Sequence, residues 1–171
     1  MEQTETLTRR EKAMRLFEEG YSCAQSVFLA FEDLHGMDRE MAAKFSSSFG
    51  AGMGRLREVC GTVSGMLMTA GLLYGYHDPK AAGEKAEHYA RVQELAKTFE
   101  ARHGSIVCRE LLGLKTKREA PVPEARTKEY YKKRPCKELI GDAAEIMDIY
   151  IRTHTIPSVS VAEPETETAE K

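Results

Sequence analysis

Apolar side chains recur every three or four residues along most of the chain, the spacing of one buried face on an α-helix. Ala13, Leu16 and Phe17 show this spacing in the first such stretch. No segment shows the strict alternation of apolar and polar positions that a half-buried strand requires, and no segment of the sequence repeats. The pattern therefore predicts an all-α protein.

Capping and breaking residues set the ends of the predicted helices. Thr8 and Ser22 each begin a capping box, in which a hydroxyl and a side chain three residues later bond free amides of the first turn. Gly20 and Gly104 close helices, because glycine adopts the left-handed backbone of a helix end without strain. The predicted helices span residues 8–20, 22–36, 38–48, 58–74, 79–103, 105–112 and 135–153.

These elements predict a single-domain helical bundle of about six to seven helices, with a glycine-rich loop before a central buried helix. A chain of 171 residues suits one domain with its own core. We expect residues 1–7 to be a flexible N-terminus and residues 8–153 to form the four-cysteine helical domain. Residues 154–171 are rich in Pro, Thr, Ser and Glu and are expected to be a disordered tail.

Composition and charge exclude several classes of partner. The net charge of −2 gives no general attraction to nucleic acid or to an anionic membrane. The longest nearly apolar stretch, residues 63–76, is shorter than the roughly 20 residues that a membrane-spanning helix needs. The N-terminus lacks the apolar segment of a signal peptide. We therefore expect a cytoplasmic protein with no membrane partner and no nucleic-acid function.

Four cysteines are the main candidates for chemistry. Cys23, Cys60, Cys108 and Cys136 each lie in or beside the first turn of a predicted helix. Free amides and positive partial charge at that position favour the thiolate, which is both the nucleophile and the metal ligand. No Cys-x-x-Cys occurs, which argues against a thioredoxin-type site or an ordinary zinc ribbon. Any shared centre must be assembled by the fold.

Basic residues stand close to these cysteines along the chain. Those expected to support the thiolates are Arg55, Arg57, Arg109, Lys133, Arg134 and Lys137. The segment 115–134 carries eight Lys or Arg, with Tyr130 and Tyr131 among them. Glu119, Glu124 and Glu129 dilute its charge, so the favoured interpretation is a solvated connection. Docking of an acidic partner, or of nucleic acid by charge and stacking, is the alternative.

A glycine-rich segment precedes the second cysteine and continues into the helix after it. Its members, Gly50, Gly52, Gly54, Gly61 and Gly65, are candidate cofactor-binding residues. The first three suit an anion-binding nest. The segment is neither a P-loop nor a dinucleotide fingerprint, because no Gly-Lys-Ser/Thr follows it and no strand precedes it. Gly61 and Gly65 share one helix face, which allows close helix packing, space for a group beside Cys60, or a homodimer interface.

Taken in order, these motifs resemble a known family. The matching stretches are Gly20-Tyr-Ser-Cys23-Ala-Gln, Phe49-Gly-x-Gly-x-Gly54, Cys60-Gly-x-x-x-Gly65 and Gly71-Leu-Leu-Tyr-Gly75, followed by Cys108 and Cys136. Over residues 8–150 the sequence is similar to the C_GCAxxG_C_C family of four-cysteine redox-active proteins, from which Thr62 departs where the family carries alanine. The resemblance implies redox or metal chemistry at the four cysteines. A similar domain in certain multihaem cytochromes points to an iron–sulfur centre, whereas covalent c-type haem is excluded because no Cys-x-x-Cys-His occurs.

Three hypotheses remain open at this point. In the first, the cysteines converge to bind an iron–sulfur cluster or another thiophilic metal, for electron transfer with an unidentified redox partner. In the second, one pair of cysteines performs thiol–disulfide exchange. In the third, the protein is a non-catalytic helical interaction module whose cysteines only pack. The count of four and the glycines around Cys60 favour the first.

Overall fold

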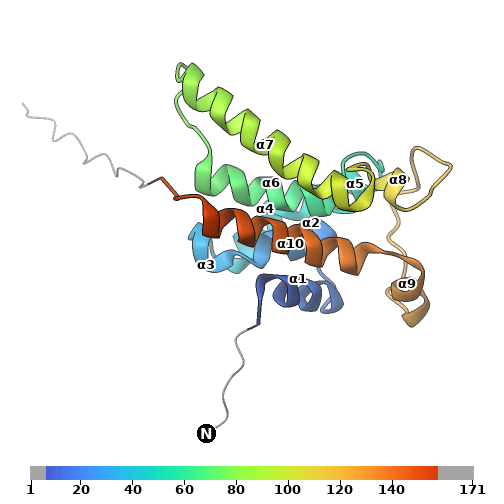
Figure 1. Cartoon of the computed structure of the whole chain (residues 1–171). Coiled ribbons are helices and arrows are strands. Elements are labelled where there is room, and N and C mark those ends of the chain that lie inside the picture. The colour runs from blue at the N-terminus through green and yellow to red at the C-terminus, as the bar shows by residue number, and fades with distance from the viewer. Residues whose placement is uncertain (1–6, 158–171) are drawn as a thin grey trace, which may run out of the picture.

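The computed structural model describes residues 7–157, and across that range it is a bundle of helices without a strand (Figure 1). The elements are α1 (Arg9–Glu18), α2 (Cys23–Leu29), α3 (Glu32–His35), α4 (Arg39–Ser46), the 3₁₀ turn η1 (Ser47–Phe49), α5 (Gly50–Gly54), α6 (Gly61–Tyr74), α7 (Ala82–His103), α8 (Cys108–Leu111), α9 (Lys128–Lys133) and α10 (Cys136–Thr153). The predicted all-α class is confirmed. The predicted flexible N-terminus and disordered tail fall mostly in residues 1–6 and 158–171, outside the described residues.

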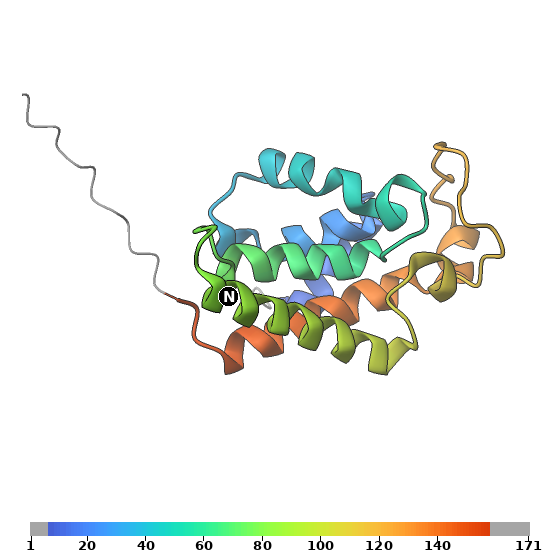
Figure 2. The ribbon, with the colours of Figure 1, turned by 90° about the horizontal axis from the view of Figure 1, so that it is seen from above.

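The central helix is α6, and its apolar sequence explains this position. Val63, Met66 and Ala70 are completely buried, as expected of a helix that is apolar on most of its surface. Helices α2, α7 and α10 pack against α6, and α1 packs against α10. Figure 2 shows α6 running between α4 and α7. Across residues 7–157, no helix combines the length and apolar character needed to cross a membrane.

Several predicted helix starts are confirmed by their caps. Thr8 and Ser22 each form a complete capping box, with Glu11 and Gln25 as the reciprocal partners. Asp38 caps α4 by accepting a hydrogen bond from the Met41 amide at 2.9 Å. These starts were predictable because every group involved lies within four residues of the cap.

The helix predicted over residues 22–36 is instead two helices, and this prediction was wrong. The first ends at Leu29 and the second begins at Glu32. The carbonyl of Ala30, between them, accepts a hydrogen bond from Arg9 Nη1 at 2.7 Å. The break allows both Phe28 and Phe31 to be completely buried. A contact with α1, far away in the sequence, thus decides where α2 ends.

Three further helix starts come later than predicted. The carboxylate of Asp78 accepts the Lys80 amide at 2.8 Å and forms a turn, so α7 begins only at Ala82. Ser105 likewise caps a turn before α8, through the Val107 amide. Helix α6 begins at Gly61, because the chain just before it forms a β-bridge.

The charged connection predicted over residues 115–134 contains a short helix that was missed, α9. Thr127 caps it by accepting the Tyr130 amide at 3.2 Å. The signal was present, as a threonine three residues before Tyr130, but the surrounding charges and prolines favoured a loop.

The predicted glycine loop is a left-handed turn. Ala51, Gly52 and Met53 have φ values of 56°, 67° and 67°. Arg55 and Arg57, which follow, also have positive φ, at 69° and 60°. Each non-glycine residue in this conformation costs about 1–2 kcal/mol. Such strain persists only where the surrounding contacts impose it, and it is common at functional sites.

Replacing Met53 with glycine is expected to stabilise the protein by about 0.5–1 kcal/mol. The gain is the relief of left-handed strain, reduced by the greater entropy of an unfolded glycine. The Met53 side chain is 42% exposed, so little packing is lost. The measurement is the free energy of unfolding in urea.

Met41→Gly is the matched control for this prediction. Met41 is 54% exposed but lies in the right-handed helix α4. There the same replacement is expected to destabilise by about 1 kcal/mol. An equal loss in the free energy of unfolding for both variants would show that the turn at Met53 is not strained.

Candidate functional site

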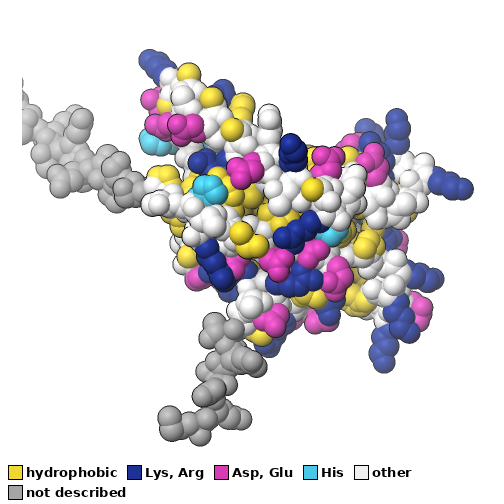
Figure 3. All heavy atoms as spheres, in the orientation of Figure 1, with side chains coloured by type: hydrophobic (Ala, Val, Ile, Leu, Met, Phe, Trp, Pro, Cys, Tyr) yellow, Lys and Arg dark blue, Asp and Glu magenta, His cyan; other side chains and the backbone are white. Residues whose placement is uncertain are grey.

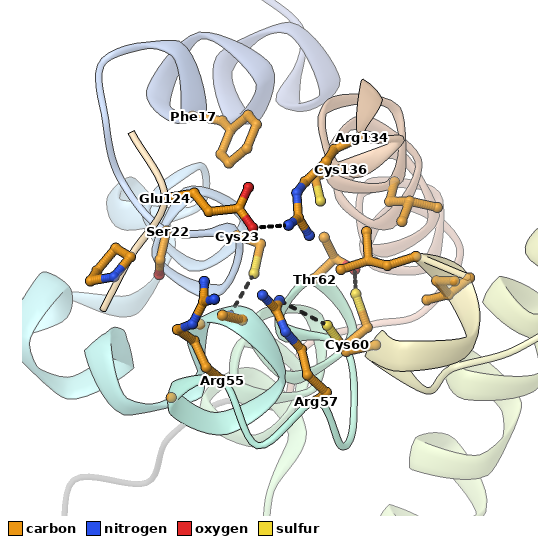
Figure 4. Close-up of a pocket in the computed structure, with 18 of the residues that line it drawn as sticks. Phe17, Ser22, Cys23, Arg55, Arg57, Cys60, Thr62, Glu124, Arg134 and Cys136 are labelled. Carbon is orange, nitrogen blue, oxygen red and sulfur yellow. Dashed lines mark hydrogen bonds and ion pairs between the residues drawn. The ribbon is translucent and has the colours of Figure 1, made fainter. Parts of the chain in front are cut away.

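All four cysteines line a single pocket of about 260 Å³, shown in Figure 4. They reach it from the starts of four helices. Cys23, Cys108 and Cys136 are the first residues of α2, α8 and α10, and Cys60 is the N-cap of α6. The predicted position of each cysteine at a helix N-terminus is therefore confirmed. The sequence could not show that these four helix starts converge, because the cysteines are separated by 37, 48 and 28 positions.

Two of the cysteines are fixed beside each other by backbone hydrogen bonds. Val59 and Val107 form an isolated antiparallel bridge. On either side of it, the Cys60 amide donates to the Ile106 carbonyl at 2.8 Å, and the Cys108 amide donates to the Glu58 carbonyl at 2.6 Å. Because these bonds join main-chain groups, they hold the backbones of Cys60 and Cys108 side by side.

A third cysteine is placed by a glycine. A Cβ on Gly61 would lie 2.4 Å from Cys23 Sγ and 2.8 Å from the carbonyl oxygen of Phe49. The Cys23 sulfur therefore occupies the space that a side chain at position 61 would fill. Gly52 has the same role at Cys108, since its Cβ would lie 2.7 Å from the Cys108 Cβ.

The remaining candidate glycines divide between the pocket wall and helix packing. Gly50 and Gly54 line the pocket. Gly65 lies against α2, where a Cβ would come within 2.6 Å of the Ala24 carbonyl oxygen. The face of α6 that carries Gly61 and Gly65 is thus covered by α2 of the same chain. It offers no surface for the homodimer interface that the sequence allowed.

Three of the four sulfurs have a hydrogen-bonding group beside them. The Ala51 amide donates to Cys23 Sγ at 3.3 Å, and Arg57 Nη1 donates to Cys108 Sγ at 3.7 Å. The Thr62 hydroxyl lies 2.9 Å from Cys60 Sγ. Hydrogen bonds to sulfur stabilise the thiolate and tune metal–thiolate centres. The sequence marked Thr62 only as a departure from the family, and only the fold shows its contact with Cys60.

Four arginines also line the pocket, whereas Glu124 is the one carboxylate among its lining residues. These arginines are Arg55, Arg57, Arg126 and Arg134. The guanidinium of Arg126 stacks over the rings of Phe17 and Tyr130. Sequence reasoning had placed Arg126 only in the basic segment. Glu119 and Glu124 pair with three of the four arginines, so the surroundings of the pocket keep a smaller net positive charge.

Three basic residues expected to support the thiolates do not line the pocket. Arg109 pairs with Glu58 at 2.9 Å, and Lys137 pairs with Glu18 at 2.5 Å. Lys133 is exposed at the surface. Neighbouring positions on a helix point in different directions, so closeness to a cysteine in the sequence did not predict which basic residues line the pocket.

The order of the cysteines and glycines around this pocket corresponds to a known family model. The model, described as "Putative redox-active protein (C_GCAxxG_C_C)", matches residues 21–150. The chain belongs to the C_GCAxxG_C_C family. No curated protein and no solved structure matches it. The family description supports redox activity at the cysteines and names no cofactor.

In this C_GCAxxG_C_C protein three of the thiols, those of Cys23, Cys60 and Cys136, have raised pKa values, which corrects the prediction from the helix N-termini at these positions. Burial raises the pKa of Cys23 and Cys60 above the ordinary thiol value. It raises the pKa of Cys136 to about 12. The partial charge at a helix N-terminus is about half a unit, and at these three sites it does not offset the loss of water around a thiolate.

Across residues 7–157, no three Cys, His, Asp or Glu side chains come close enough together to hold one metal ion. Four thiolates around one zinc ion would each lie about 2.3 Å from it. The four cysteines of this C_GCAxxG_C_C protein instead line the wall of one pocket.

Proposed function

We propose that the four cysteines hold one redox centre, an iron–sulfur cluster or another thiophilic metal centre, which transfers electrons to a partner. The observation that carries this proposal is that all four cysteines, each at a helix start, line one pocket together with four arginines. Cys23, Cys60, Cys108 and Cys136 would be the ligands. Ligation by four cysteines is the usual arrangement for such clusters. The centre would supply one-electron chemistry.

The charge of the surroundings supports an anionic guest. Four thiolates give an iron–sulfur centre a net negative charge, which is costly to bury without compensation. Arg57 is 4% exposed and donates to Cys108 while it pairs with Glu119, and Arg134 is 14% exposed and pairs with Glu124. Arg126 makes no ion pair among the described residues, so the four arginines of the pocket outnumber the two glutamates that pair with them. Helix N-termini at all four ligands add to the compensation. The raised thiol pKa values belong to the metal-free protein, and metal binding would release those protons.

Pocket size favours a cluster over a single ion. The pocket of about 260 Å³ lies among sulfurs that are not gathered into a single-ion site. Gly52 and Gly61 keep the space beside Cys108 and Cys23 free of side chains. A mononuclear zinc site would require the pocket to contract, whereas a cluster would use the space that it has.

Thiol–disulfide exchange is the second candidate, and one observation favours it. All four cysteines are free, and Cys23 Sγ lies against the backbone of Gly61, next to Cys60. Cys23 and Cys60 are therefore a candidate pair for a disulfide, and Cys60 and Cys108, which lie on either side of the β-bridge, are another. Burial raises the pKa of the Cys23 and Cys60 thiols, however, so neither has the character of an activated nucleophile.

Anaerobic reconstitution with iron and sulfide tests the proposal. We expect the protein to retain iron and sulfide in nearly equal amounts, with the broad visible absorption of an iron–sulfur centre. Retention of zinc instead, with colourless protein, would identify another thiophilic metal. A protein that retains no metal after reconstitution would contradict the proposal and leave thiol exchange or simple packing of the cysteines.

A further inference from the structure

One wall of the pocket is formed by a long connection between α8 and α10, residues 113–135, here called the strap. Pro121, Pro123, Arg126 and Tyr130 from the strap all line the pocket. Arg55 holds the strap through the Ala120 carbonyl, to which its Nε donates at 2.6 Å. The outward side of the strap is therefore the protein surface that lies directly over the cysteines on this wall.

The strap is strongly basic in a chain that is otherwise acidic. Residues 115–134 carry eight Lys or Arg and three Glu, a net charge of +5. The net charge of the whole chain is −2, which leaves −7 for all other residues, and −2 of this belongs to the rest of the described range, residues 7–114 and 135–157. Seven of the eight basic side chains are exposed. In Figure 3, Lys and Arg side chains project from the end of the molecule that carries α8 and α9.

The acidic residues of the strap do not neutralise this surface. Glu119 pairs with Arg55 and with the buried Arg57, and Glu124 pairs with Arg134 beside the pocket. Only Glu129 pairs within the strap's outward face, with Lys132 at 3.6 Å. Across the described residues, six strap cations make no ion pair: Lys115, Lys117, Arg118, Arg126, Lys128 and Lys133. Arg126 lines the pocket, and the other five are exposed. Of the three glutamates that dilute the charge in the sequence, only Glu129 therefore does so on the outward face.

The strap does not have the features of a nucleic-acid site. Single-stranded nucleic acid is bound by basic residues together with exposed aromatic rings on which bases stack. Tyr130 and Tyr131 are only partly exposed, and both rings pack against Phe17. Tyr131 also contacts the carbonyl of Phe17 through its hydroxyl, at 3.5 Å. The outward face of the strap is thus charged without a stacking platform, which favours a protein partner.

We infer that the outward face of the strap is the docking surface for an acidic redox partner protein. The inference rests on the proposed electron-transfer function, since it names the partner of that centre. Complementary charge steers the encounter of two proteins and fixes their orientation. A partner with an acidic surface would be guided to the strap, the surface that covers one wall of the cysteine pocket.

Binding of a fluorescently labelled acidic ferredoxin, followed by anisotropy, tests this inference. The probe is expected to bind the wild-type chain at about 20 mM salt and to dissociate by about 200 mM. In the variant K117E/K128E, binding is expected to weaken by at least about tenfold, because like charges now face each other. The assay needs no metal, so loss of binding and failure of the metal proposal are separate results.

A charge-matched control separates the strap from net charge. K80E/K85E changes the same charge at the start of α7, and it is expected to alter binding less than about twofold. Equal weakening in both variants, or no binding by the wild type, would overturn the inference. Salt-sensitive self-association of the wild type that K117E/K128E abolishes would also overturn it, because a second copy would then occupy the strap.

Discussion

Replacing Gly61 with alanine is expected to destabilise the protein by about 3 kcal/mol and to prevent assembly of the cysteine site. The added Cβ would lie 2.4 Å from Cys23 Sγ, 2.8 Å from the Phe49 carbonyl oxygen and 3.2 Å from the Ala24 amide nitrogen. Two of these three neighbours are backbone atoms, so they cannot move aside as a flexible side chain would. Relief of the clash requires α2 and α6 to separate, which displaces Cys23 from the pocket.

Gly71→Ala is the matched control, because it places the same methyl group in the same helix. The nearest atom to that Cβ would be His88 Nε2, at 4.0 Å. Alanine is the better helix former, so this variant is expected to be neutral or more stable by up to about 1 kcal/mol. Unfolding in urea measures both variants. Similar stability for the two would show that Cys23 is not held against the Gly61 backbone as described.

Replacing Cys136 with serine is expected to lower retention of the metal centre by more than about 100-fold, since loss of second-shell partners alone costs about 10–100-fold. Serine has nearly the same size as cysteine, and Cys136 is only partly buried, so the fold should survive. Bound iron and sulfide after anaerobic reconstitution are the measurement, and the circular dichroism spectrum verifies folding.

Lys137→Ser is the control for this variant, since it places the same residue one position further along α10. Lys137 pairs with Glu18 away from the pocket. Exposed ion pairs contribute little to stability, about 0–1 kcal/mol. The Lys137→Ser variant is expected to retain metal like the wild type. Full retention by Cys136→Ser would remove Cys136 from the ligand set.

The sequence predicted those features of the fold that depend on local contacts. The capping boxes at Thr8 and Ser22, and the helix start beside Cys136, involve groups only a few residues apart. Where a distant contact determined the backbone, the sequence misled. Arg9 bonding to Ala30 divides one predicted helix into two, and the bridge between Val59 and Val107 delays the start of α6.

The candidate site shows the same division. All four cysteines and the glycines beside them could be found by residue type and spacing. The protonation state could not, because burial of Cys60 depends on packing from the whole chain, whereas the helix N-terminus is a local feature. The positions of Thr62, Arg126 and the inward-turned Glu119 were equally hidden, since each contacts its partner only through the fold.

The central claim is that the four cysteines of one chain ligate one inorganic centre. Native mass spectrometry of the anaerobically isolated protein tests it most directly, by comparing the mass of the folded chain with its mass after denaturation. The folded wild-type chain is expected to be heavier than the denatured chain by the mass of one iron–sulfur cluster or of one other metal centre. The Cys136→Ser variant is expected to lack this excess mass. A folded wild-type chain with no excess mass, even after reconstitution, would contradict the claim.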